Sequence, residues 1–212
     1  MKNYTILVVL VIMAFNACKK ESHHATSDST AAEAIASGPV TSEPTLESFK
    51  KGERWIWMEK SVAEGRTRHE GKEHLEVVEF EGSLGLWNGR DTTLISNILN
   101  QEQSDTPYRS WPLKVGKKWT YETDWENAEG SPMTTSMEVE VVSYGEEAVL
   151  AGRFQAYKIE YKGTITNHTF GKGSEVHNIH WYAPALKMNI KQVQDDGYGS
   201  YVLELLDYKS GE

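Results

Sequence analysis

The amino-acid sequence predicts an all-β protein whose strongly curved antiparallel sheet forms a half-barrel or barrel. Apolar and polar side chains alternate with a period of two through most of the chain after residue 47, as expected for strands with one buried and one solvated face. Turn-forming residues separate these runs. A set of roughly eight to ten short strands must protect its edges, which favours a curved sheet over a flat one.

The predicted strands follow one another along the chain, each bounded by residues that favour turns. One segment, residues 91–103, favours a helix or a mixed structure, with Asp91 or Thr92 as its N-cap. The expected strands are residues 54–60, 73–81, 119–125, 134–144, 154–161, 176–182, 186–194 and 198–208, and the expected turns lie at residues 64–65, 88–89, 128–132, 144–145, 171–173 and 195–197.

Two similar motifs predict that the domain is built from two halves with similar opening strands. GERWIWM begins at Gly52 and GKKWTYE begins 64 residues later, at Gly116. Each motif puts glycine at a turn and two aromatic residues on one face of the strand that follows. Such rings stabilise a core or line a cleft for a lipid or a sugar. Under the second interpretation the ligand-binding residues are Trp55, Trp57, Trp119 and Tyr121.

The N-terminus has the layout of an export signal. Lys2 supplies a positive charge, residues 5–15 form an unbroken apolar run, and small Ala17 precedes Cys18. The run is too short to span a hydrocarbon core of about 30 Å, so we expect residues 1–17 to be a signal peptide. Residues 15–18 (FNAC) resemble the lipobox of bacterial lipoproteins, which implies lipidation of Cys18 and attachment to the membrane through that lipid.

Residues 18–46 are expected to be the lipidated cysteine and a flexible tether. The tether is rich in Ser, Thr, Ala and Glu and contains no aromatic residue, so it buries too little apolar surface to offset the entropy of ordering. Within it, Asp28-Ser29-Thr30 resembles the acceptor of O-glycosylation in Bacteroidetes, and Lys19-Lys20-Glu21 resembles a surface-export signal. Residues 47–212 then form a single all-β domain.

Composition excludes several classes of function. The formal net charge is −9, which argues against nucleic-acid binding because phosphate backbones require clustered Lys and Arg. Cys18 is the only cysteine, so the chain has neither an intrachain disulfide nor a multi-cysteine zinc site.

No known catalytic motif occurs in the sequence. It contains no Gly-x-Ser-x-Gly elbow, no phosphate-binding loop and no His-Glu-x-x-His. His177 and His180 are three residues apart in a predicted strand and so point to opposite faces, although His168 could approach either one across a hairpin. We therefore predict no catalytic residue, no metal site and no cofactor. The alternative is a hydrolase or metal-dependent enzyme whose residues converge only in three dimensions.

The ordered set of motifs in the domain resembles the DUF3108-like or TapB-type family of exported bacterial β proteins. The matching segments are KKGERWIWM, WPLKVGKKWTYE, EEAVLAGRFQAYKIEY, HWYAPALKMNIKQ and LELLDYK, which together span most of residues 50–209. Leu150 replaces the proline that usually precedes Ala151-Gly152 in that family. The resemblance implies a curved β domain in the envelope and no agreed activity.

These observations predict a lipid-anchored lipoprotein of the bacterial envelope, at the outer membrane and on its periplasmic face or the cell surface. Its domain is expected to be a non-enzymatic binding module. Two types of partner remain open: an apolar ligand such as a lipid or other hydrophobic small molecule, held in a concave sheet, or an envelope protein docked on an edge or face.

Overall fold

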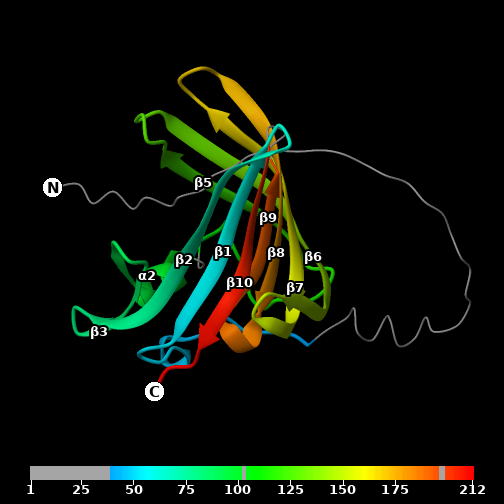
Figure 1. Ribbon diagram of the computed structural model, residues 1–212. Coiled ribbons are helices and arrows are strands. Elements are labelled where there is room, and N and C mark those ends of the chain that lie inside the picture. Colours follow the sequence, from blue (N-terminus) through cyan, green and yellow to red (C-terminus); the bar gives the residue numbers. More distant parts are fainter. Residues whose placement is uncertain (1–38, 102–103, 196–198) are drawn as a thin grey trace, which may run out of the picture.

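The computed structural model describes residues 39–101, 104–195 and 199–212 (Figure 1). The predicted signal peptide, Cys18, Asp28-Ser29-Thr30 and most of the predicted tether lie outside these ranges. Near residue 39 the chain is attached to the domain, because Thr41 forms an isolated antiparallel bridge with Leu113.

The described chain folds into one antiparallel sheet of ten strands, which confirms the all-β prediction. A short helix, α2 (Ile95–Gln101), follows β4, and two 3₁₀ turns, η1 (Leu46–Ser48) and η2 (Pro184–Leu186), complete the secondary structure. The strands are β1 (Arg54–Ala63), β2 (Arg66–Phe80), β3 (Ser83–Trp87), β4 (Thr92–Leu94), β5 (Lys118–Glu126), β6 (Pro132–Val149), β7 (Gly152–Asn167), β8 (Lys172–Ala183), β9 (Met188–Asp195) and β10 (Gly199–Lys209).

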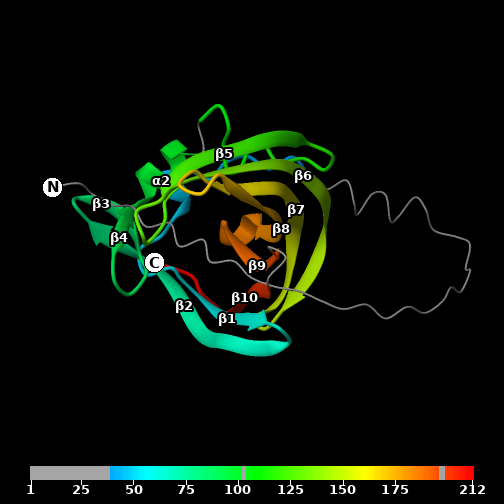
Figure 2. The ribbon, with the colours of Figure 1, turned by 90° about the horizontal axis from the view of Figure 1, so that it is seen from above.

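Two meanders make up the sheet. β1 to β4 run outward in one direction, β5 to β10 return from the other edge, and β10 pairs with β1. The sheet is strongly curved, so that β1 and β5 lie on opposite sides of it (Figure 2). It is not closed, because β4 and β5 are its two terminal strands. The half-barrel therefore describes the architecture better than the closed barrel.

Most of the expected strands are present, but their limits differ. β6 runs through the turn expected at residues 144–145, so that prediction was wrong: Gly145 pairs with Ala156, and the chain turns only after Val149. The segment predicted as helical is split between β4 and α2, and the helix begins at Ile95 rather than at residue 91. Pro184 ends β8 and starts η2, because its ring removes a ladder donor.

The two glycine-tryptophan motifs have the same local structure, which confirms that the halves open alike. Gly52 and Gly116 have positive φ values of 78° and 82°, a conformation that glycine adopts without steric cost. The Gly52 amide donates to the carbonyl of Val77, and the Gly116 amide donates in the same way to Val141. The register then matches residue for residue at the same 64-residue offset: Trp55 faces Leu75 in the first half, and Trp119 faces Val139 in the second.

The concave side of the sheet holds two clusters of buried apolar residues. The first surrounds Trp55, Trp57 and Leu205, and is closed at one end of the sheet by η2, whose Leu186 is buried. The second lies over β5 to β8 and includes Tyr157, Tyr161 and Tyr182 of those strands together with Leu113 of the connection before β5. The connection between α2 and β5 covers this second cluster, since its Tyr108 and Trp111 pack against it.

A buried ionic network joins the beginning of the sheet to its end. The side chain of Glu53, only 2% exposed, accepts from Lys187 Nζ at 2.6 Å and from the Tyr208 hydroxyl at 2.8 Å. Burial and the Glu53 carboxylate raise the pKa of Tyr208 to about 12, so the phenol stays a hydrogen-bond donor at neutral pH. Glu53 precedes β1, Lys187 follows η2 and Tyr208 lies in β10, so three distant segments meet at one carboxylate.

We expect Lys187→Met to lower the free energy of unfolding by about 3 to 5 kcal/mol, because it leaves a buried carboxylate without its counter-charge. Chemical denaturation monitored by tryptophan fluorescence measures the change. Lys51→Met is the matched control: the pair Lys51–Glu79 is exposed on both sides, so its loss should change stability little. Adding Glu53→Gln to Lys187→Met should restore part of the loss. Equal effects of the two lysine substitutions would contradict a structural role for the network.

A second constraint lies where β6 and β7 approach closely. A Cβ atom on Gly163 would lie 2.0 Å from the Ser136 carbonyl oxygen and 2.7 Å from the Met137 Cα atom. Backbone atoms on the neighbouring strand cannot move aside as a flexible side chain can. Glycine is therefore required at this position by space.

We expect Gly163→Ala to destabilise the protein by about 1 to 3 kcal/mol or more, since the added methyl overpacks the ladder. Thermal unfolding followed by circular dichroism tests this expectation. Gly173→Ala on β8 is the control, because the nearest atom to its Cβ would be 3.5 Å away. The steric argument fails if the two variants melt at the same temperature.

Candidate functional site

The predicted ligand-binding residues Trp55 and Trp57 lie in the first apolar cluster. Both side chains are buried, at 0% and 5% exposure. Their indole N–H groups donate to the carbonyl oxygens of Leu186 at 3.1 Å and Asn189 at 2.9 Å. Each ring is thus packed and hydrogen-bonded by η2 and the start of β9, and the pair performs the core function that the sequence left open.

Trp119 and Tyr121 lie on the opposite side of the curved sheet, packed against the second cluster. Trp119 donates to the carbonyl of Pro107 at 3.0 Å, and the Tyr121 ring contacts Tyr108 edge-on at 5.3 Å between centroids. Both are partly buried, and burial raises the pKa of Tyr121. The structure therefore assigns the four aromatic residues to two clusters rather than to one site. Contact of any of them with a ligand stays a prediction.

The histidines are arranged as the alternation predicts. His177 is exposed on the outer face of β8, whereas His180 is buried on the inner face. His168 lies after β7, with its Nε2 atom 2.7 Å from the Thr134 hydroxyl. Within residues 39–101, 104–195 and 199–212, no three His, Cys, Asp or Glu side chains are placed to hold a metal ion. No helix in those ranges combines the length and the apolar character needed to cross a membrane.

Two carboxyl groups meet on the inner face, where the enzyme alternative would need them. Glu59 on β1 and Glu73 on β2 are diagonal neighbours. Partial burial, followed by the nearby Glu59 carboxylate, raises the pKa of Glu73.

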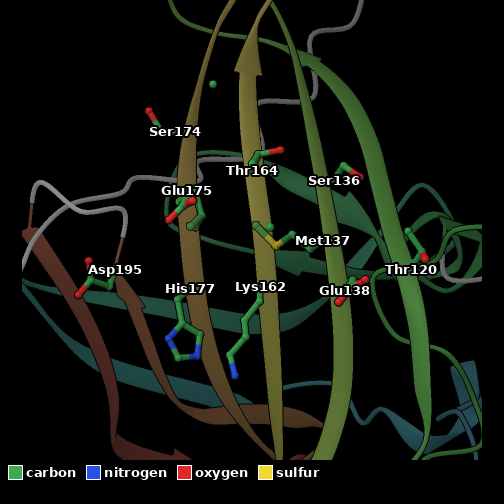
Figure 3. Close-up of a pocket in the computed structure, with 13 residues that line it drawn as sticks. Thr120, Ser136, Met137, Glu138, Lys162, Thr164, Ser174, Glu175, His177 and Asp195 are labelled. Atoms are coloured by element: carbon green, nitrogen blue, oxygen red, sulfur yellow. The ribbon is translucent and has the colours of Figure 1, made fainter.

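A wide hollow of about 1170 Å³ lies on the outer face of the sheet, over β5 to β9 (Figure 3). Strand register places its floor residues side by side, because directly paired residues of neighbouring strands point to the same side. We call this hollow the outer groove. One row of its lining runs across five strands as Thr120, Glu138, Lys162, His177 and Asp195, and the next row contains Ser136, Thr164 and Glu175.

The outer groove is lined by both polar and apolar residues, the latter including Met137 and Val176, and carries more negative than positive charge. Its lining includes three carboxylates, from Glu138, Glu175 and Asp195, and one lysine, Lys162. Lys162 Nζ also contacts Glu160 at 2.5 Å, and that hydrogen bond lowers the pKa of Glu160. The positive charge of Lys162 is therefore partly neutralised by the Glu160 carboxylate. The groove therefore presents carboxylate and hydroxyl groups at the surface of the sheet.

The sequence predicted solvated strand faces but no groove on the outer side of the sheet. The polar half of the alternation does identify the outer side chains of β6, β7 and β8. It does not identify which strands are neighbours or how the sheet bends, and both decide whether a polar face is flat or hollow.

Comparison with known proteins found two solved structures. One is a protein from Bacteroides fragilis assigned as exported and described as having a YmcC-like fold, at 13% identity and a TM-score of 0.41, covering 81% of this chain and 100% of that chain. The other is a protein from Parabacteroides distasonis assigned as a lipoprotein, at 12% identity and a TM-score of 0.47, covering 76% of this chain and 97% of that chain. No family model and no curated protein matches the chain, so membership of the DUF3108-like family stays a prediction.

His180 gives the site region a testable dependence on pH. Burial, followed by the positive charge of Arg109, lowers its pKa to about 3, whereas the unfolded chain should bind the proton near pH 6.5. Above pH 6.5 the imidazole is neutral in both the folded and the unfolded state, so His180 does not lower the free energy of unfolding there. As the pH falls from 6.5 towards 3, the unfolded state is favoured by a little over 1 kcal/mol per pH unit.

We expect the free energy of unfolding to fall more steeply between pH 6.5 and 4 in the native sequence than in a His180→Gln variant. Urea denaturation at several pH values measures the slopes, and proton NMR of the imidazole should show one ring that does not titrate above about pH 4. His168→Gln is the control at an exposed histidine. A His180 resonance that titrates near pH 6.5 in the folded protein would refute the assignment.

Proposed function

We propose that this protein is a lipid-anchored envelope lipoprotein whose β domain docks a second envelope protein in the outer groove. The occupant that fits best is an extended, basic segment of that partner. The observation that carries the proposal is the groove itself: a hollow of about 1170 Å³ on the face opposite to the core, lined mainly by carboxylates and hydroxyl groups.

Charge complementarity favours a basic partner. The carboxylates of Glu138 and Glu175 belong to exposed residues, so they can pair with a Lys or Arg side chain without a large desolvation cost. Complementary charge of this kind steers association and fixes register more than it adds affinity.

The position of β5 favours an extended segment. β5 is a terminal strand of the sheet and borders the groove through Thr120. A terminal strand presents backbone donors and acceptors that an added strand can pair with. The connection before β5 covers part of this edge, since the Glu122 amide donates to the Thr106 carbonyl at 3.4 Å. An incoming segment would pair beyond that point and lay alternate side chains over the groove.

The aromatic residues that would hold an apolar ligand pack inside the two core clusters, so the proposal takes a protein partner over a lipid. The export signal and Cys18 supply the rest of it: a lipid anchor, a tether, and an envelope location on the periplasmic face or the cell surface. No step of chemistry is part of the proposed function.

Fluorescence anisotropy of the purified chain with a labelled peptide of alternating Lys and Thr residues tests the proposal. We expect saturable binding that weakens at least fivefold in Glu138→Gln/Glu175→Gln and weakens with added salt. The control Glu70→Gln/Glu81→Gln makes the same change of charge outside the groove and should bind as the native sequence does. Equal loss in both double variants, or equal binding of a Glu-Thr peptide, would contradict docking in the groove.

A further inference from the structure

Three polar atoms are buried on the inner face of the sheet without a hydrogen-bond partner. They are Asn178 Oδ1 and His180 Nε2 on β8 and Gln194 Oε1 on β9. The three residues are 6%, 2% and 8% exposed. Buried polar atoms are almost always paired in folded proteins, and each exception requires an explanation. Here three exceptions occur on two adjacent strands.

Strand register gathers these atoms into one layer. Asn178 lies directly opposite Gln194, and His180 lies directly opposite Gln192. The same row continues to Tyr161 on β7 and to Tyr201 on β10. We call this set the inner polar layer: an imidazole and three amide side chains between two tyrosines. It lies on the face opposite to the outer groove.

His180 is held in one orientation within the layer. Its Nδ1 atom is 2.6 Å from the Tyr108 hydroxyl, and its ring lies 4.8 Å from the Tyr161 ring centroid. Because burial keeps the imidazole neutral, Nε2 provides one donor or one acceptor, depending on which nitrogen carries the proton. The two unpaired amide oxygens, of Asn178 and Gln194, can only accept.

The chemistry of this layer selects its ligand. Two orphaned oxygens require O–H or N–H donors, and a neutral imidazole adds one more hydrogen bond. An acyl chain would leave all three atoms unpaired. We infer that the inner polar layer, at Asn178, His180 and Gln194, binds a saccharide whose hydroxyl groups complete these hydrogen bonds.

The residue that covers the layer lies outside the sheet. Tyr108, whose hydroxyl contacts His180, belongs to the connection before β5.

Saturation-transfer difference NMR of the purified chain tests the inference, using an equimolar mixture of glucose, galactose, mannose and N-acetylglucosamine as the probe. We expect at least one of these sugars to receive magnetisation and to raise the melting temperature in a concentration-dependent manner. Asn178→Leu/Gln194→Met, which removes both amide oxygens at similar volume, should weaken its binding at least tenfold.

Two further measurements keep the result interpretable. Ser136→Ala/Thr164→Ala removes hydroxyl groups from the outer groove and should leave sugar binding unchanged, so loss of peptide docking and loss of sugar binding are separable. Native mass spectrometry and circular dichroism check that each variant is folded. The inference is overturned if none of the four sugars binds, if binding survives in Asn178→Leu/Gln194→Met, or if a fatty acid binds at the layer in place of a sugar.

Discussion

The pairing of β1 with β10 is the constraint on which the rest of the structure depends. Each meander alone has two edges, and this one ladder joins them into a single sheet. The Glu53 network strengthens the same junction, because it joins the residue before β1 to η2 and β10. A contact between the two ends of the domain forms late in any folding pathway dominated by local hairpins. The first core cluster draws residues from both meanders, so it is complete only once this ladder has formed.

Much of the sheet could be predicted from sequence because its strands follow simple local rules. β5 alternates between exposed and partly buried residues along its full length, and the two glycine-tryptophan motifs begin strands at Arg54 and Lys118 as expected. β3 was missed because it is short: it spans only Ser83–Trp87 and follows the two-residue turn Glu81-Gly82, in which both residues have positive φ values.

Side-chain direction was harder to predict than strand position, since bulges interrupt the alternation. β6 carries an irregularity between Val141 and Ser143, and the pairing of β8 with β9 shifts between Trp181 and Tyr182. A bulge adds one residue to one strand and so exchanges the inner and outer sets beyond it. Gly145 shows a separate difficulty. As a glycine after a tyrosine it predicted a turn, yet it occupies a continuous strand. Neither candidate site could be assembled from sequence, because both require residues from neighbouring strands.

The two candidate sites arise from the same strands and differ in what their existence implies. On β7 and β8, Lys162 and His177 point outward, while Tyr161 and Asn178 point inward. Exposed charges on the outer face cost little in water and therefore persist without a function. An unpaired buried polar group costs about 1 to 3 kcal/mol, a large share of the stability of a small domain. Replacing Asn178 or Gln194 with an apolar residue would remove that cost. Their presence on the inner face therefore points to a function more strongly than the outer charges do.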